Sequence, residues 1–399
     1  MQVSGFDPIH LLSFLQIFLG SILSRAGAGR LLGSDMKKGK EEESNAAKPS
    51  EREVFELSGP VHLTFVDWRL PEHRRSVAAS LVQGVYILER DRQQNRQGTT
   101  ALASAWWEHF NFQLIQVLVD EADSSTFGAI YQYKQAQYLN VPNPVPSYVV
   151  AFRGTITKPD SRARDIKLDL QFVLNGLTRC SRYKAGLQAI EGLVSQVGPS
   201  NVWLAGHSLG AAIALQAGKH MAKRGCYVET YLFNPPFSSL PLEKIKDAWL
   251  KDGIRYTGSL LTAGLATLVK GISSSTSSIT GLATHGPQSN DPFLGLYSWV
   301  PNLFVNPADP ICLEYVGYFE YRDKMVAMGR GGIERIAAKN SIVSLVSGMM
   351  GRDGEAAHLL PSAFVTSNMS PAEDFKKAHG IHQWWSPHPY WHSKVYQLR

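Results

Sequence analysis

The sequence contains few cysteines and no repeated long apolar runs, and both absences narrow the class of protein. Its 399 residues include three cysteines, Cys180, Cys226 and Cys312, and no C-x-x-C pair. Neither a zinc site nor a disulfide framework is therefore predicted, and the three thiols are expected to be reduced and mostly buried. No run of 18 or more strongly apolar residues recurs, which excludes an integral membrane protein with several spans.

Charged residues are also scarce, at 19% of the chain, and the balance of 40 Lys and Arg against 34 Asp and Glu leaves a net charge of +6. There is no dense basic cluster with interleaved aromatic residues, so a nucleic-acid partner is not expected. Hydrophobic residues make up 44% of the chain, which is enough to form a folded core. The weak positive bias leaves mild attraction to an anionic membrane surface open.

The first 53 residues differ in composition from the rest. Residues 8–24 are apolar and uncharged, so residues 1–36 form an extension for which three interpretations stay open: an interfacial or targeting helix, a signal peptide, or a dispensable segment. Residues 37–53 hold five basic and five acidic residues and no large apolar one, which predicts a disordered linker. The three unpaired thiols favour a cytoplasmic protein, whereas residues 8–24 favour contact with a membrane surface.

From residue 54 to residue 399, short apolar runs alternate with helical patterns. This alternation predicts an α/β domain with a mostly parallel central sheet flanked by helices. Helices are expected at 99–120, 181–197 and 209–224. Strands are expected at 127–134, 146–152, 201–205, 227–233, 303–305, 313–321 and 362–368, the last of these closing the sheet. The Ser- and Gly-rich stretch at about 242–300 and the glycine-interrupted stretch at 324–358 are expected to be insertions.

One short motif carries chemistry. Gly206-His207-Ser208-Leu209-Gly210 is a G-x-S-x-G pattern that follows the apolar run Asn201–Ala205 and precedes small residues. A nucleophilic serine of this kind sits on a tight strand-to-helix turn, where flanking glycines prevent clashes and the start of the helix favours negative charge. The motif and its context therefore predict that Ser208 is a nucleophile.

These residues resemble the nucleophile elbow of the α/β-hydrolases, and more narrowly that of class 3 lipases, the fungal triacylglycerol-lipase type. A second block, VVAFRGT at 149–155, resembles the [FY]-R-G-[ST] block of that family and precedes Ser208 by 53 residues. The resemblance implies that Thr155 and the backbone N–H of Leu209 form the oxyanion hole. The segment FNPPF at 233–237 departs from the Tyr/Phe-Gly-x-Pro turn of many members.

A serine nucleophile needs a histidine to take its proton and a carboxylate to orient that histidine, in the chain order Ser, Asp, His. Asp309 follows the apolar run 303–305 within NPADPI, which resembles the N-x-x-D-x-[IV] segment of the family. Asp291 is the alternative acid, but no strand precedes it. The wide spacing of 101 residues between Ser208 and Asp309 is explained by the insertion at 242–300.

The general base is predicted among five downstream histidines: His358, His379, His382, His388 and His392. His379 follows Ala378 in an aromatic-rich segment, as the family's [AD]-H pattern does, so it is the favoured base and His382 the alternative. His207, inside the elbow, is expected to pack structurally. Residues 155–180 occupy the place of the family's lid, and their apolar residues (Leu168, Leu170, Phe172, Val173 and Leu174) fit either a lid over an acyl pocket or an ordinary core helix.

The resemblance thus implies a serine esterase or lipase that cleaves acyl esters, with lipids as the expected substrates, through an acyl-enzyme and without a metal or other cofactor. The chain resembles the plant-type branch, some members of which carry the label GDSL esterase/lipase, although it has no Gly-Asp-Ser-Leu block. An acyltransferase or thioesterase would use the same triad, and a catalytically silent lipase-like scaffold stays open as an alternative. A peptidase fits the second block less well. The oligomeric state is not predicted.

Overall fold

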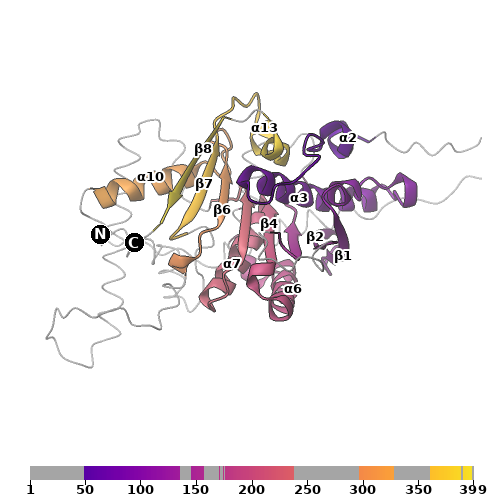
Figure 1. Cartoon of the computed structure of the whole chain (residues 1–399), viewed down its shortest axis with the longest axis horizontal. Helices are drawn as coiled ribbons and strands as arrows, with labels where there is room; N and C mark the ends of the chain where they lie inside the picture. Colours follow the sequence, from indigo (N-terminus) through magenta and orange to yellow (C-terminus); the bar gives the residue numbers. More distant parts are fainter. Residues whose placement is uncertain are drawn as a thin grey trace, which may run out of the picture. The chain divides into compact units, whose positions relative to one another are not determined.

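In the part of the chain that the structure describes, eight strands form one mixed sheet, and their order in space follows their order along the chain (Figure 1). The structure is a computed structural model that describes residues 49–134, 145–156, 170, 174, 176–237, 296–327, 360–387 and 390–397. The strands are β1 (Phe112–Val119), β2 (Thr126–Tyr133), β3 (Tyr148–Phe152), β4 (Val202–His207), β5 (Glu229–Phe233), β6 (Asn302–Val305), β7 (Ala363–Asn368) and β8 (Trp391–Tyr396).

The centre of the sheet is parallel and its edges are antiparallel. Strands β3 to β7 pair in parallel, whereas β1, β2 and β8 run antiparallel to their neighbours. The predicted mostly parallel sheet flanked by helices is therefore present. The α-helices are α2 (Phe55–Ser58), α3 (Pro71–Gln93), α4 (Ala105–Glu108), α6 (Ser181–Val197), α7 (Leu209–Lys223), α10 (Glu314–Ala327) and α13 (Phe375–His379). Short 3-10 helices are η1 (Glu51–Glu53), η2 (Gly98–Thr100), η4 (Leu177–Arg179), η5 (Pro199–Asn201) and η7 (Ile381–Trp385).

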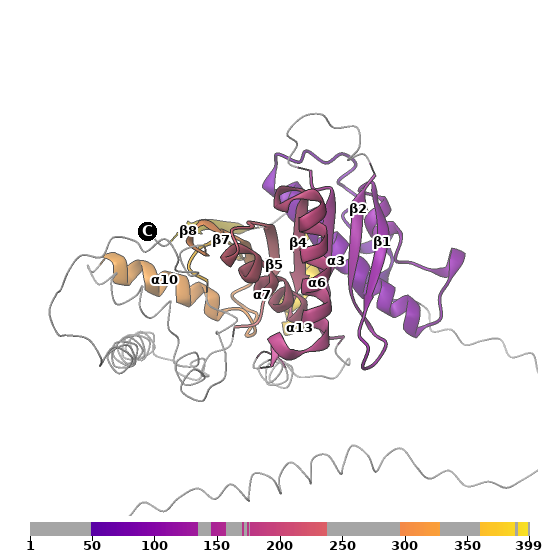
Figure 2. The same ribbon diagram turned by 90° about the horizontal axis from the view of Figure 1, so that it is seen from below.

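Helices cover both faces of the sheet, and successive residues of each central strand enter different cores. Val150 and Leu204 belong to one hydrophobic cluster together with residues of α6, α7 and α10. Their strand neighbours Val149 and Trp203 belong to a second cluster together with residues of α3, α4 and η7. Side chains alternate between the two faces of a strand, so a strand buried on both faces is continuously apolar, as predicted for 146–152 and 201–205. Figure 2 shows α3 behind the strands and α6 and α7 in front of them.

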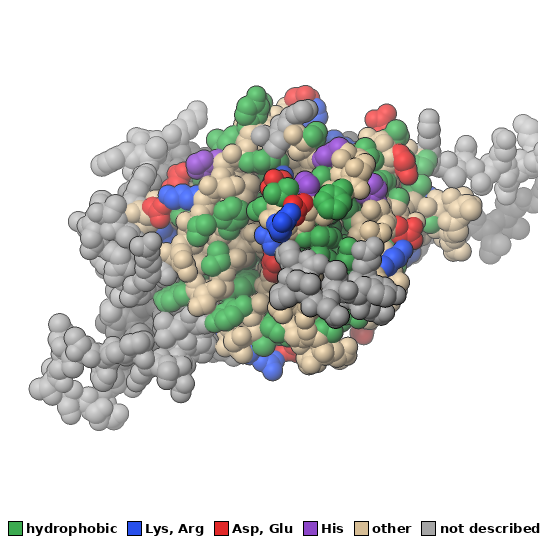
Figure 3. All heavy atoms as spheres, in the orientation of Figure 1, with side chains coloured by type: hydrophobic (Ala, Val, Ile, Leu, Met, Phe, Trp, Pro, Cys, Tyr) green, Lys and Arg blue, Asp and Glu red, His purple; other side chains and the backbone are tan. Residues whose placement is uncertain are grey.

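The face of the molecule that Figure 3 shows mixes its side-chain types. Hydrophobic patches, histidines and charged groups of both signs are interspersed over the described part of this face (Figure 3). This arrangement agrees with the weak net charge of the sequence.

The predicted helix at 99–120 is wrong. Its first part forms only η2 and the single turn of α4, in which Trp106 and Trp107 are buried. Asn111 then has a φ of 61°, and β1 begins at the next residue. The aromatic residues of this segment, Trp106 and Phe110 among them, recur at helical spacing. Asn111, however, tolerates the left-handed backbone that turns the chain, and the segment after it, which contains Ile and Val, pairs with β2.

Two other expectations need correction. The predicted strand at 313–321 is the first half of α10, because Tyr315 and Phe319, four residues apart, are the side chains that enter the core. The sheet does not end at β7, since β8 pairs antiparallel with it. Strand β8 lies at the sheet edge, and its four central residues are exposed, so it lacks the apolar pattern of the inner strands. The long helix α3 is absent from the predicted elements.

Several predicted segments lie outside the described residues: the extension at 1–36, most of the linker at 37–53, and most of the insertions at 242–300 and 324–358. Within the linker, Glu51–Glu53 form η1, and the carboxylate of Glu53 pairs with Arg96 at 2.8 Å, so ordered structure begins before Val54. Of the five apolar residues in the proposed lid, Leu170 and Leu174 are described, and both are buried in a core cluster. In the part that the structure describes, no helix is long and apolar enough to cross a membrane.

Candidate active site

Ser208 sits on a sharp turn between β4 and α7. Its φ of 55° and ψ of −124° are unusual for a residue with a side chain, and its N–H donates to the carbonyl of Phe233 at 3.0 Å. Its own carbonyl accepts from the N–H groups of Ala211 and Ala212, which begins the helix. A strained backbone of this type persists only where the surroundings fix it, and it presents the serine at the carboxyl end of a central strand.

Two glycines make the turn possible. A Cβ on Gly206 would lie 2.3 Å from the carbonyl oxygen of Gly210, and a Cβ on Gly210 would lie 2.3 Å from the carbonyl oxygen of Phe152. Both contacts are with backbone atoms, so neither can be relieved by a side-chain rotation. The close approach of α7 to β3 and β4 is thus the physical reason for glycine at both ends of the motif.

Replacing Gly210 by alanine is expected to lower the free energy of unfolding by at least about 1–3 kcal/mol, because the new methyl group overlaps the backbone of β3. Gly192→Ala in α6 is the matched control, since a Cβ there meets nothing within 4 Å and alanine favours the helix by about 1 kcal/mol. Urea unfolding of both variants measures the difference in their free energies of unfolding. A Gly210→Ala variant as stable as Gly192→Ala would contradict this account of the turn.

Asp309 is fully buried in the turn after β6, and its carboxylate accepts four hydrogen bonds. Oδ2 accepts from His379 Nδ1 at 2.8 Å, from Asn234 Nδ2 at 2.7 Å and from the thiol of Cys312 at 3.2 Å. Oδ1 accepts from the N–H of Ile311 at 3.0 Å. Burial raises the pKa of Asp309, but His379 and the hydrogen bonds outweigh burial and hold this pKa below its ordinary value. The carboxylate is therefore charged at neutral pH.

His379, the last residue of α13, is the histidine that contacts Asp309. His382 lies three residues further along the chain, and its Nε2 lies 3.3 Å from the carbonyl of Arg52. His392 is exposed on β8. The alternative acid Asp291, and also His358 and His388, lie outside the described residues.

A cavity of about 390 Å³ brings the predicted residues together. Ser208, His379, Thr155 and the alternative base His382 all line it. Thr155 lies three residues after the end of β3. Leu209 is the first residue of α7, so no helical carbonyl lies one turn earlier to accept a hydrogen bond from its backbone N–H. The cavity lies at the carboxyl ends of the parallel strands, where α/β proteins bind their ligands.

A larger hollow of about 540 Å³ lies elsewhere, between the first turns of α3 and the strands β5 to β8. None of the predicted site residues lines it, and the chemistry of the motifs therefore favours the smaller cavity.

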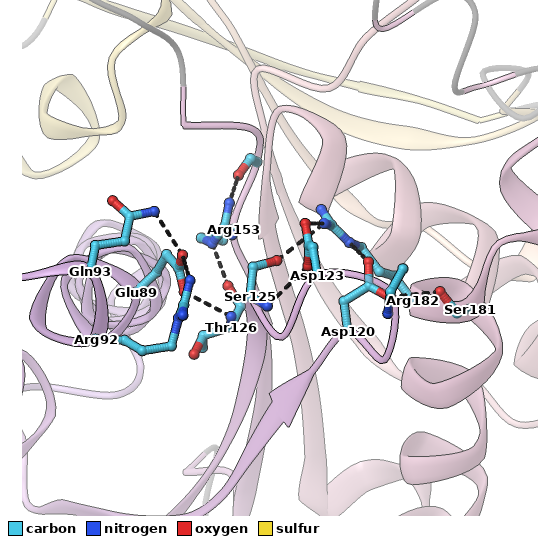
Figure 4. Close-up of polar contacts among 12 residues, drawn as sticks. Glu89, Arg92, Gln93, Asp120, Asp123, Ser125, Thr126, Arg153, Ser181 and Arg182 are labelled. Atoms are coloured by element: carbon cyan, nitrogen blue, oxygen red, sulfur yellow. Dashed lines mark hydrogen bonds and ion pairs between the residues drawn. The ribbon is translucent and has the colours of Figure 1, made fainter. Parts of the chain in front are cut away.

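A buried polar network supports the segment that carries Thr155 (Figure 4). Arg153 donates from Nε to the carbonyl of Thr126 and from Nη1 to the carbonyl of Gly154, the latter at 2.7 Å. The N–H of Thr126 in turn donates to Glu89 on α3 at 2.8 Å. Burial raises the pKa of Glu89, but Arg92 and its other donors lower it to about 2. The Arg in the [FY]-R-G-[ST] block thus fixes the backbone next to Thr155.

Asn234 is a site residue that the sequence did not single out as functional. Besides Asp309, its Nδ2 contacts the carbonyl of Ala378 at 3.1 Å, and its Oδ1 accepts from Trp384 Nε1 at 2.7 Å. One side chain thereby joins the end of β5, the acid and the segment that carries His379. Its φ of 45° lies in the left-handed region, and Asn is among the few residues other than glycine that tolerate this conformation.

The three cysteines form no disulfide. Only Cys312 is fully buried, whereas Cys180 and Cys226 are half-buried, which is less burial than predicted. Cys180 caps the start of α6, where its sulfur accepts from the N–H of Tyr183 at 3.4 Å. Burial and the neighbouring Asp309 raise the pKa of Cys312 well above its ordinary value, so the thiol stays protonated and donates to the carboxylate. Within the described ranges, no group of three His, Cys, Asp or Glu side chains could hold a metal ion.

Comparison with known proteins finds a relative in Arabidopsis thaliana that is named a GDSL esterase/lipase. The two chains are 49% identical over 355 residues, which cover 88% of this chain and 99% of the relative. No family model matches the chain.

Proposed function

The chain belongs to the family of this GDSL esterase/lipase, and we propose that it cleaves carboxylic esters of lipids with Ser208 as nucleophile, His379 as base and Asp309 as acid. The observation that carries the proposal is the 2.8 Å contact between His379 and buried Asp309 beside the cavity that Ser208 also lines. A serine on a strained strand-to-helix turn with a carboxylate-oriented histidine in the same cavity is the constellation that acyl transfer requires.

The reaction begins when the Ser208 hydroxyl attacks the ester carbonyl carbon. Its proton passes to Nε2 of His379, while the carboxylate of Asp309 holds the Nδ1–H and stabilises the imidazolium. The carbonyl oxygen becomes an oxyanion, for which the backbone N–H of Leu209 and the hydroxyl of Thr155 are the proposed donors. The C–O bond then breaks, and the alcohol leaves with the proton from His379.

The acyl group is now bound to Ser208 as an ester. A water molecule gives a proton to His379 and attacks the acyl carbon, and the C–O bond to Ser208 breaks as its oxygen regains that proton. The acid is released and the enzyme returns to its starting state. His379 accepts and returns each proton that is transferred, so the reaction balances without a cofactor.

We further propose that the domain has the α/β-hydrolase fold of the class 3 lipase type. The strand order, the elbow after β4, the acid after β6 and the histidine after β7 support this proposal. The letters GDSL in the name of the relative describe a block that this chain lacks, so Ser208 is proposed from its own motif and geometry.

Labelling of the full chain with a fluorescent fluorophosphonate tests the proposed nucleophile and base. We expect the label on the peptide that contains Ser208, and we expect His379→Ala to reduce the labelling rate by at least about 10³-fold. His382→Ala is the matched control and should label at nearly the wild-type rate. Equal losses in both histidine variants would overturn the assignment of the base. Folded protein that does not react, with or without detergent, would favour a silent scaffold.

A further inference from the structure

A series of hydrogen bonds connects helix α3 to the segment that carries the proposed base, and it passes through His207, the residue before Ser208. The hydroxyl of Tyr86 lies 2.8 Å from Nδ1 of His207, and it accepts from the N–H of Gly154 at 2.8 Å. On its other side, Nε2 of His207 lies 2.7 Å from the backbone carbonyl of His379. The side chains of Tyr86 and His207 therefore connect four segments that are distant in sequence: the end of β3, the elbow, α3 and α13.

The hydrogen-bonding partners determine which atom carries the proton in each of these hydrogen bonds. The carbonyl of His379 can only accept, so Nε2 of His207 must carry a hydrogen. Burial lowers the pKa of His207 to about 3, with a further contribution from His379, so the ring is neutral and its Nδ1 can only accept. Tyr86 must then donate to Nδ1. Burial also raises the pKa of Tyr86 to about 12, so its hydroxyl keeps the proton that it donates.

Gly154 lies close to both the nucleophile and the hydroxyl of Tyr86. A Cβ on Gly154 would lie 2.7 Å from both the Cβ of Ser208 and the hydroxyl of Tyr86. The rings of His207 and His379 have centroids 4.8 Å apart. A shift of Tyr86 or His207 would therefore move the backbone beside Thr155, the nucleophile or the base, because hydrogen bonds and close contacts link these groups.

We propose that Tyr86 and His207 act as one positioning unit, which holds the oxyanion segment and His379 at a fixed separation around Ser208. This inference rests on the proposed function, and it gives His207 a task beyond the structural packing expected from the sequence. Neither side chain takes part in bond making. Their contribution is to keep the reacting groups in the geometry from which the reaction proceeds, where a misplacement of 1 Å costs about 100-fold.

Removal of one hydroxyl group tests the unit. Tyr86→Phe is expected to lower kcat on p-nitrophenyl butyrate by about 10- to 100-fold, because the geometry of the reacting groups changes. KM should change less than about twofold, because the ring that lines the cavity is kept and the hydroxyl that is lost is bonded to His207 and Gly154. Tyr131→Phe is the matched control. Tyr131 is fully buried against α3, at Gly84, but its hydroxyl has no hydrogen-bond partner among the described residues, so its loss should leave kcat unchanged.

Two substitutions of His207 separate the two hydrogen bonds of the ring. Asparagine places an amide group near the position of Nδ1 and can keep the bond to Tyr86, whereas glutamine reaches the position of Nε2 and can keep the bond to His379. Each is expected to lower kcat by about 10-fold or more. The double variant Tyr86→Phe with His207→Gln should lose little beyond the larger single effect, because both changes break the same hydrogen bond.

The outcomes separate this inference from the proposed function. Wild-type protein that neither hydrolyses the ester nor reacts with fluorophosphonate overturns the proposed function. Active wild type with equal kcat in Tyr86→Phe and Tyr131→Phe overturns the positioning unit alone, as does a double variant whose losses multiply. Thermal melting checks that each variant is folded, and the His207 variants carry the test if Tyr86→Phe is not.

Discussion

Replacing Ser208 by alanine is expected to lower kcat for ester hydrolysis by about a millionfold and to abolish fluorophosphonate labelling. The triad works as a unit, so loss of the nucleophile removes almost all of its effect, and only the binding site and the oxyanion donors still contribute. The free energy of unfolding should change by less than about 0.5 kcal/mol, because the Ser208 side chain forms no hydrogen bond with another described residue. A p-nitrophenyl ester assay and urea unfolding measure the two quantities.

Ser124→Ala is the matched control for this variant. Ser124 has a φ of 57°, close to that of Ser208, but it is exposed in the turn between β1 and β2 and does not line the cavity. It controls for the effect of alanine in a left-handed backbone, and it should keep full activity. If Ser208→Ala kept a tenth of the wild-type rate in protein free of contaminating esterases, the nucleophile would be a different residue.

The parts of the site that could be predicted from sequence are those whose signal is local. The turn at Ser208 needs its glycines within two residues, and the strand before it is continuously apolar because it is buried on both faces. Asp309 and His379 each stand in a short segment that resembles a known pattern. For these residues, a few neighbours in the chain carry the information that fixes the local geometry.

The supporting residues could not be predicted because their partners are far away in the sequence. Asn234 meets Asp309 across 75 residues, and Tyr86 meets His207 across 121. Nothing next to Tyr86 distinguishes it from other aromatic residues of a buried helix. One local signal was available for Asn234, since it stands where glycine is common in similar turns and adopts the same positive φ.

Local patterns were misleading where packing from another element decides the structure. Residues 99–120 contain aromatic residues at helical spacing, Trp106 and Phe110, yet the second half, Phe112–Val119, pairs with β2 and is a strand. Residues 313–321 have the composition of a strand, but their buried side chains lie on one helical face against the sheet. In both cases tertiary contacts outweigh a weak intrinsic propensity.

Replacing Asp309 by asparagine is expected to lower kcat by about 10⁴-fold, which corresponds to about 5 kcal/mol of transition-state stabilisation. The carboxylate accepts hydrogen bonds from four donors, including Nδ1 of His379. An amide has only one accepting atom, so its NH₂ group must face one of these donors. If that donor is His379, the ring changes tautomer, and its Nε2 carries a hydrogen and cannot take the proton from Ser208. The assay is kcat on the p-nitrophenyl ester at neutral pH.

Asp91→Asn distinguishes this effect from a general loss of stability. Asp91 is also buried, and its carboxylate accepts from Arg96 and from the N–H groups of Leu102 and Ala103, but it does not line the cavity. Both variants should lower the free energy of unfolding, because each leaves a buried donor unsatisfied. Only Asp309→Asn should lose specific activity beyond the loss that its smaller folded fraction explains. Equal specific activities of the two folded variants would show that the Asp309 carboxylate is structural, and His379 would then need another group to fix its tautomer.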